Sequence, residues 1–189
     1  VDMMDSIASY SHKYSINHYE TRLDFQSTAL MKNNLSYGLG AILYNLNRGI
    51  VEPFGPISLR TSTDLGIEKG LELSAYLSDH FTVTERLNVD AGLRYTAFSP
   101  LGPKTVYQYE ENEPRTEEYI SDSLNFSNNS AIKWYHEPDI RLSFNFETDK
   151  NGSVKISFNQ LHQNLFMLNN SIAIAPNTQW KLSDYHLKP

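Results

Sequence analysis

The sequence predicts an all-β fold, arranged as an antiparallel up-and-down meander of about six long strands. Three observations predict it. Apolar and polar residues alternate over long stretches, no stretch keeps a helical period for more than a turn or two, and short connections alternate with long ones. Because successive side chains of an extended backbone leave opposite faces of a sheet, strict alternation is typical of a strand whose two faces meet different surroundings.

The first clear strand is expected at 17–27, after a weakly patterned start at 1–14 that we interpret as the end of a strand and a loop. A polar turn at 31–34 leads into a second strand at 35–45. This strand contains Gly38 and Gly40. Glycine weakens a strand intrinsically, so the pair indicates a place where another backbone comes close or the sheet bends.

The remaining strands are expected at 71–78, 87–100, 140–147 and 154–159. The pattern is clearest at 87–100, where the odd-numbered residues from Leu87 to Tyr95 are apolar and the even-numbered ones are polar or glycine. Tight turns are expected at 79–86 and around Asn151-Gly152. Strands that are neighbours along the chain should pair antiparallel, so that 71–77 lies beside 87–98 and 140–146 beside 154–158.

The connections decide between kinds of all-β protein. Long loops are expected at about 46–66, 99–138 and 160–189, and short turns join the strands at their other ends. A structureless loop of nearly forty residues is unusual in a compact soluble domain. Outer-membrane β-barrels have short turns at one end and long loops at the other. No apolar run approaches the roughly 20 residues of a transmembrane helix. We therefore expect a segment of an outer-membrane β-barrel.

In such a segment the apolar face would contact lipid and the charged face would line the lumen. Outside a membrane the apolar face would form an exposed patch, so its own long loops should cover it or copies of the chain should associate. The patch comprises Leu23, Phe25, Leu39, Leu73, Leu93, Leu142, Phe144 and Ile156. The expected lumen-facing residues are Glu20, Arg22, Asp24, Glu72, Asp90, Arg94, Arg141, Glu147 and Lys155.

Composition argues against several other functions. The net charge is −6 with both signs interspersed, so nucleic acid is not expected as a partner. The chain has no Cys, and its six His lack the helical i, i+4 pairing of a zinc site, so no metal or cofactor is expected. Adjacent acids such as Glu110 and Glu111 are typical of a solvated loop, so no enzymatic activity is expected. The loop aromatics most suited to stacking on a ligand are Tyr107, Tyr109, Tyr119, Trp134 and Tyr135.

Five segments, in this order along the chain, carry a family resemblance: LNVDAGLRYTAFSPLGP (87–103), VYQYE (106–110), EPDIRLSFNF (137–146), SVKISFNQLHQNLFMLNN (153–170) and APNTQW (175–180), which leads to LKP (187–189). Together they resemble the TonB-dependent receptors of the bacterial outer membrane, especially the branch of starch-utilisation-type nutrient importers. One departure is Phe158-Asn159-Gln160, where the family often has Tyr-Asn-Arg, so no role of that arginine carries over.

The resemblance implies a middle piece of a 22-stranded barrel in the outer membrane of a Gram-negative bacterium. The chain shows no recognisable plug domain, TonB box or closing strand. The whole receptor would import a scarce nutrient such as a siderophore, a cofactor or an oligosaccharide, and the piece alone would transport nothing. Implied partners are membrane lipid, the receptor's own plug domain and TonB, and a surface lipoprotein partner is compatible with the family. The alternative is a soluble secreted β-sandwich that binds carbohydrate.

Overall fold

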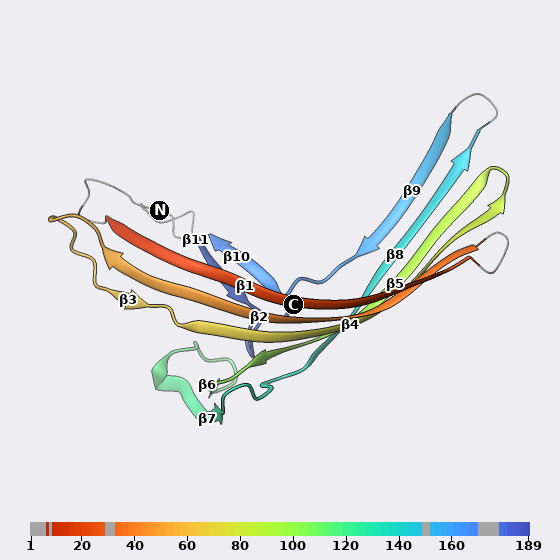
Figure 1. The fold of residues 1–189 in the computed structure, drawn as a ribbon. Coiled ribbons are helices and arrows are strands. Elements are labelled where there is room, and N and C mark those ends of the chain that lie inside the picture. The colour runs from red at the N-terminus through yellow and green to blue at the C-terminus, as the bar shows by residue number, and fades with distance from the viewer. Residues whose placement is uncertain (1–6, 8, 29–32, 149–151, 170–177) are drawn as a thin grey trace.

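The computed structural model describes residues 7, 9–28, 33–148, 152–169 and 178–189 (Figure 1). These residues form strands, connections and one short 3-10 turn, η1 (Glu117–Tyr119). The fold is all-β, as predicted.

Six strands form a curved antiparallel sheet in the order β1-β2-β4-β5-β8-β9, and a two-residue strand, β3 (Thr63–Asp64), pairs with β2. The sheet is a meander that curls into a half-barrel (Figure 1). The predicted pairings are confirmed, because Leu77 of β4 lies opposite Leu93 of β5 and Phe144 of β8 opposite Ile156 of β9. No Greek-key crossing occurs in the described sheet. The six strands are β1 (Tyr10–Ser27), β2 (Asn33–Pro53), β4 (Ile67–Thr84), β5 (Leu87–Leu101), β8 (Tyr135–Glu147) and β9 (Ser153–Gln160).

Several strands are longer than the alternation predicted. β1 begins at Tyr10 because its first residues continue to pair with the end of β2, beyond a bulge between Lys13 and Ser15. Gly49 faces this bulge with a φ of +74°, and a Cβ there would overlap the carbonyl oxygen of Lys13, so glycine is required. β4 continues to Thr84, which shortens the predicted turn at 79–86 to two residues.

Two hairpins occupy segments that were predicted to be loops, so those two predictions are wrong in part. β6 (Lys104–Tyr109) pairs with β7 (Ile120–Phe126) inside the expected 99–138 loop. β10 (Leu165–Asn169) pairs with β11 (Thr178–Leu182) inside the expected 160–189 loop. The short connections, after β1, β4 and β8, still alternate along the meander with the long ones after β2, β5 and β9.

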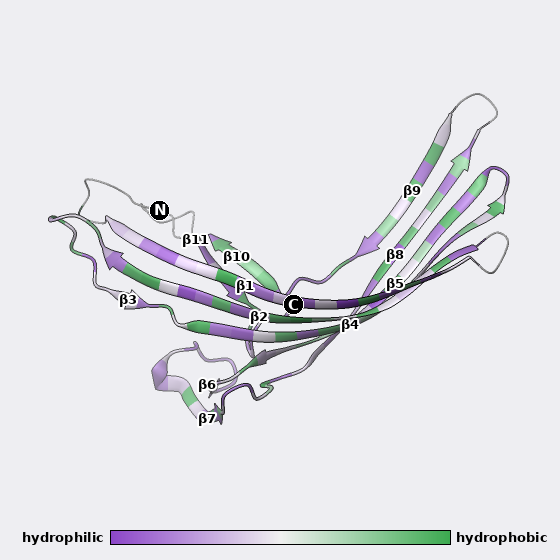
Figure 2. Cartoon of the chain, viewed as in Figure 1, coloured by the Kyte–Doolittle hydropathy of each residue, from purple (hydrophilic) through white to green (hydrophobic). Residues whose placement is uncertain are grey.

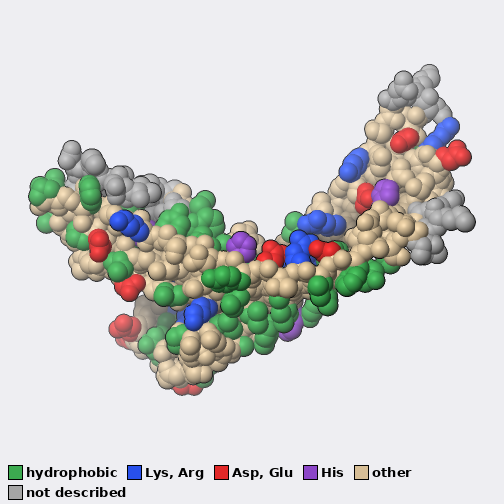
Figure 3. Space-filling view, viewed as in Figure 1, with side chains coloured by type: hydrophobic (Ala, Val, Ile, Leu, Met, Phe, Trp, Pro, Cys, Tyr) green, Lys and Arg blue, Asp and Glu red, His purple; other side chains and the backbone are tan. Residues whose placement is uncertain are grey.

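The two faces of the sheet differ in character. Hydrophobic and hydrophilic residues alternate along β4, β5 and β8 (Figure 2), hydrophobic side chains gather on the convex side, and charged ones lie along the concave side (Figure 3). Of the eight residues in the predicted apolar patch, seven are 41–66% exposed and Leu142 is half-buried. One carboxylate interrupts the apolar face: Asp79, which accepts a hydrogen bond from Asn33 (3.1 Å).

The main hydrophobic cluster lies on the concave side. Phe98 of β5, Leu46 of β2, Tyr135 of β8 and Leu182 of β11 are buried together. The β10–β11 hairpin thus packs into the concavity (Figure 1). The expectation that long loops would cover the apolar patch is therefore wrong for the described residues, because the hairpin's own apolar residues find partners on the opposite face.

Candidate functional site

The concave face carries all the charged residues that the alternation assigned to one side. Register places Glu20, Arg22 and Asp24 of β1 in line with concave-face positions of β2 and β4. The other six share this parity: Glu72, Asp90, Arg94, Arg141, Glu147 and Lys155. Whether this face lines a lumen stays a prediction.

Three charged residues of β1 and a tyrosine of β4 form an exposed ladder. Arg22 lies 3.8 Å from Glu20 and 3.4 Å from Asp24, and the Tyr76 hydroxyl donates to Asp24 (2.7 Å). Gly38 lies in line with Asp24 and Tyr76, and a Cβ there would come within 2.5 Å of the Leu23 carbonyl oxygen. A glycine at this position therefore lets the ladder close across β2.

Glu72 is the centre of the buried part of this face. It is 7% exposed and accepts hydrogen bonds from the Tyr44 hydroxyl (3.0 Å), the Arg94 guanidinium (3.1 Å) and the Asn164 amide (3.0 Å). A buried carboxylate is stable only when paired and hydrogen-bonded, and here both conditions are met. Because Asn164 follows β9, Glu72 links the wall of the sheet to the C-terminal part of the chain.

Residues 161–169 and 178–189, here called the C-terminal strap, are held by further carboxylates. Asp139 accepts hydrogen bonds from the backbone N–H (2.9 Å) and the Nδ1 (2.8 Å) of His162, whose Nε2 lies 3.1 Å from Glu137. Glu68 of β4 accepts from the backbone N–H of Leu182 (2.9 Å) and from Lys181 (3.1 Å). The strap is thus anchored at both ends of its path across the concavity.

Lys181 and Asp184 form an ion pair within the strap, 2.9 Å apart. Burial alone would raise the pKa of Asp184, but the hydrogen bond from Lys181 and the charge of Lys104 hold that pKa well below its usual range. Burial would likewise lower the pKa of Lys181, but the hydrogen bond to Asp184 and the charge of Glu68 raise it above its usual value. Both groups are therefore charged around neutral pH.

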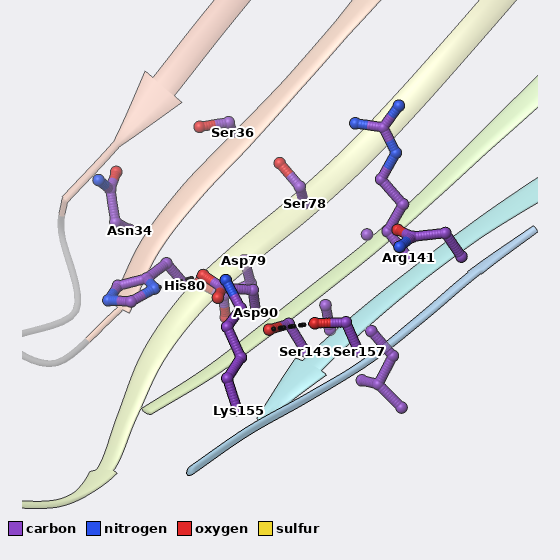
Figure 4. Close-up of a pocket in the computed structure, with 14 residues that line it drawn as sticks. Asn34, Ser36, Ser78, Asp79, His80, Asp90, Arg141, Ser143, Lys155 and Ser157 are labelled. Carbon is purple, nitrogen blue, oxygen red and sulfur yellow. Dashed lines mark hydrogen bonds and ion pairs between the residues drawn. The ribbon is translucent and has the colours of Figure 1, made fainter. Parts of the chain in front are cut away.

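A polar hollow of about 440 Å³ lies on the concave face toward the short turns (Figure 4). His80 Nδ1 lies 2.5 Å from Asp90, and Ser157 donates to Ser143 (3.3 Å). Arg141 and Lys155 also border the hollow. Its remaining polar lining residues are Asn34, Ser36, Ser78, Asp79 and Asn159.

The five aromatic candidates fall into two groups, one on the β6–β7 hairpin and one at the start of β8. Tyr107 and Tyr109 are on β6, Tyr119 is in η1, and Trp134 precedes β8. Tyr107 and Trp134 are exposed, whereas Tyr135 is buried and its hydroxyl donates to the carbonyl oxygen of Asp184 (2.7 Å). Tyr135 is thus a core residue that holds the strap. Ligand contact by the other four stays a prediction.

The residues that anchor the strap were not among the predicted site residues, apart from Glu72 and Tyr135, because 160–189 was predicted to be a loop. Glu68, Asp139 and His162 carry no local pattern that distinguishes an anchor from a solvated side chain. Within the described parts of the chain, no group of three or more His, Asp or Glu residues is arranged to hold a metal ion.

In the part of the chain that the structure describes, no helix is long and apolar enough to cross a membrane.

Comparison of the chain with protein-family models, with curated proteins and with solved structures finds no match in any of the three.

Proposed function

We propose that this chain is part of the wall of an outer-membrane β-barrel, in a TonB-dependent receptor that imports a scarce nutrient into a Gram-negative bacterium. The observation that carries the membrane part is the bare convex face. Several of its large hydrophobic side chains, such as Leu39 and Ile156, are more than half exposed. Soluble monomers rarely expose contiguous apolar patches above a few hundred Å², and each Å² costs roughly 25 cal/mol in water. Lipid tails would remove that cost.

The position of the apolar band supports a tilted sheet in a bilayer. We call the stretch of each strand whose convex-face residues are mainly apolar the apolar band. It runs from 19 to 25 on β1 and from 138 to 146 on β8. The middle of the β1 band lies at the level of position 22, and register places position 22 in line with position 137 of β8. The β8 band, however, is centred near residue 142. The band therefore shifts by about five residues over four strand-to-strand steps. With about 3.4 Å per residue and 4.8 Å per strand, the strands tilt by about 40° to the band normal.

That tilt lies within the 35–45° of outer-membrane barrels. The height of the band agrees as well. The nine residues of the β8 band extend about 27–30 Å along the strand and, at a 40° tilt, rise about 22 Å. Outer-membrane barrels have an apolar band about 25 Å tall. A face that is apolar only because of chance alternation has no reason to shift along the register in this way.

The receptor part of the proposal depends on the sequence resemblance described above. In that class the concave polar face would line the lumen, with the plug domain and TonB as partners and a surface lipoprotein as a compatible one. The alternative, a secreted carbohydrate-binding sandwich, needs a second layer over the apolar face. Among the described residues the β10–β11 hairpin packs on the other face, which favours the barrel.

Single-cysteine labelling tests the membrane part, because the chain has no Cys of its own. Leu77→Cys and Leu93→Cys place a polarity-sensitive fluorophore on the convex face, and Ser74→Cys and Ser78→Cys place it on the concave face of β4. In the complete barrel, where β1 and β9 are both paired, refolded into lipid vesicles, convex labels should be quenched by nitroxide lipids and concave labels by aqueous iodide. Equal quenching at neighbouring positions would refute the proposal.

The receptor class has a separate test in the source gene. We expect a plug domain encoded upstream and further alternating strands downstream. An unrelated catalytic domain beside this segment would instead favour the carbohydrate-binding module.

A further inference from the structure

We infer that the polar hollow on the concave face is a binding site for a small anion that carries a carboxylate or phosphate group. This inference goes beyond the proposed function and does not depend on membrane insertion. Two features carry it: two cations without partners, and hydrogen-bond donors between them.

The arginines of the concave face differ in whether they form an ion pair with a carboxylate. Arg22, Arg48 and Arg94 each lie within 3.4 Å of a carboxylate oxygen. Arg141 borders the hollow and, within the described part of the chain, makes no hydrogen bond or ion pair; the same holds for Lys155. Both side chains are exposed on the concave side. Two cations left unpaired on a face where the others are paired indicate a partner from outside the chain.

The two cations can reach the same ligand. Arg141 lies on β8 opposite Asn159, and Lys155 lies on β9 opposite Asn145. They are thus on adjacent strands, four residues apart in register, or about 13 Å along the sheet. Both side chains are long and border one cavity. Figure 4 shows Ser143 and Ser157 between them, over the middle of the hollow.

The space and the donors between the cations suit an oxyanion. Gly92 lies opposite both Ser78 and Arg141, and a Cβ at Gly92 would stand 3.4 Å from the Cβ of Ser78, so the absent side chain leaves room there. Serine hydroxyls and asparagine amides can donate to carboxylate or phosphate oxygens, and hydrogen bonds from Arg and Lys to such groups are the strong ones.

The two acids at the hollow do not pair with its cations. Asp90 is bonded to His80, and Asp79 accepts its hydrogen bond from Asn33 on the convex face. Within the described residues no ion pair joins either acid to Arg141 or Lys155, so both cations stay available to an incoming anion. A volume of about 440 Å³ is that of a small-molecule site, whereas docking of a polypeptide needs a larger surface.

Equilibrium dialysis of the full chain in detergent micelles tests the inference, with inorganic phosphate and citrate as separate probes. We expect saturable one-to-one binding of at least one probe, and the preferred probe identifies phosphate or carboxylate chemistry. Arg141→Gln and Lys155→Gln should each weaken binding about tenfold or more. The matched control is Arg22→Gln, which removes the same charge from an arginine that is already paired, and it should change the affinity by less than about threefold.

Two results would overturn the inference. One is the absence of saturable binding of either probe by a chain whose circular dichroism shows a folded sheet. The other is equal weakening by Arg22→Gln and Arg141→Gln, because binding would then follow total charge and not the hollow. A variant that fails to fold is replaced by Gly92→Ala, which projects a methyl group into the hollow at an ordinary contact distance and should also reduce binding.

Discussion

Replacement of Leu93 by arginine separates a lipid-facing wall from a water-facing one. Leu93 is 52% exposed at the middle of the apolar band on β5, between Leu77 of β4 and Ile140 of β8. In an outer-membrane barrel an arginine at the bilayer midplane costs about 2–4 kcal/mol. At an exposed position in water a surface substitution stays within about ±0.5 kcal/mol. The two environments therefore predict effects that differ several-fold.

The measurement is urea unfolding of the complete barrel, with β1 and β9 paired, from lipid vesicles, followed by tryptophan fluorescence. With a slope of about 2 kcal/mol/M, Leu93→Arg should lower the midpoint by about 1–2 M. The control is Leu59→Arg. Leu59 is 81% exposed but lies in the connection after β2, outside the band, so the midpoint should move by less than about 0.3 M.

An equal and small effect at both positions would show that the convex face meets water, and the membrane proposal would fail. An equal and large effect would mean that arginine impairs refolding in general. In that case Leu93→Ala, which carries no charge, distinguishes the two causes, because only a lipid-facing site should tolerate alanine far better than arginine.

Three further predictions concern the fold that supports this face. Leu182→Ala, at a side chain 1% exposed, should loosen the C-terminal strap by about 2–5 kcal/mol, measured by hydrogen exchange in β11. Gly38→Ala should destabilise the sheet in urea while Gly92→Ala does not, because the new Cβ would lie 2.5 Å from a backbone oxygen at Gly38 but no closer than 3.4 Å to any neighbour at Gly92. The lowered pKa of Asp184 contributes stability that is fully present above the ordinary aspartate pKa near 4 and is lost as the pH falls further. The raised pKa of Lys181 contributes stability that is fully present below the ordinary lysine pKa of 10.5 and is lost as the pH rises further. Protection of the strap from proteolysis should thus be constant from about pH 5 to 10 and fall outside that range; protection unchanged at pH 2 would contradict it.

The sheet could be predicted from the sequence because its signals are local. Alternation with a period of two identified all six long strands, and neighbours along the chain pair as a meander does. The parity of a residue such as Arg94 also predicted its face. Strand ends were less predictable, because pairing at Tyr10 and Thr84 continues where the alternation no longer shows it.

The strap could not be predicted, because its contacts join residues that are far apart in sequence. The bond from Asn164 to Glu72 spans 92 positions, and the bond from Leu182 to Glu68 spans 114. No local pattern marks Glu72 as the partner of an asparagine. Tyr135 was proposed as a ligand contact for the same reason: nothing near it in the sequence shows that Phe98 and Leu182 bury it.

The edges of the sheet limit how this chain can function in a membrane. β1 and β9 are the outer strands of the described sheet, and each has a partner on one side only. In hydrocarbon every backbone N–H and C=O needs a partner, so an open sheet of six strands cannot remain there with two free edges. Further strands must pair with both, from a longer chain or from copies of this one. Pairing β1 of one copy with β9 of another would leave more than half of the 18 residues of β1 unpaired, because β9 has only 8. In the proposed barrel, neighbouring strands of matching length would pair with both edges and lipid would cover the bare face.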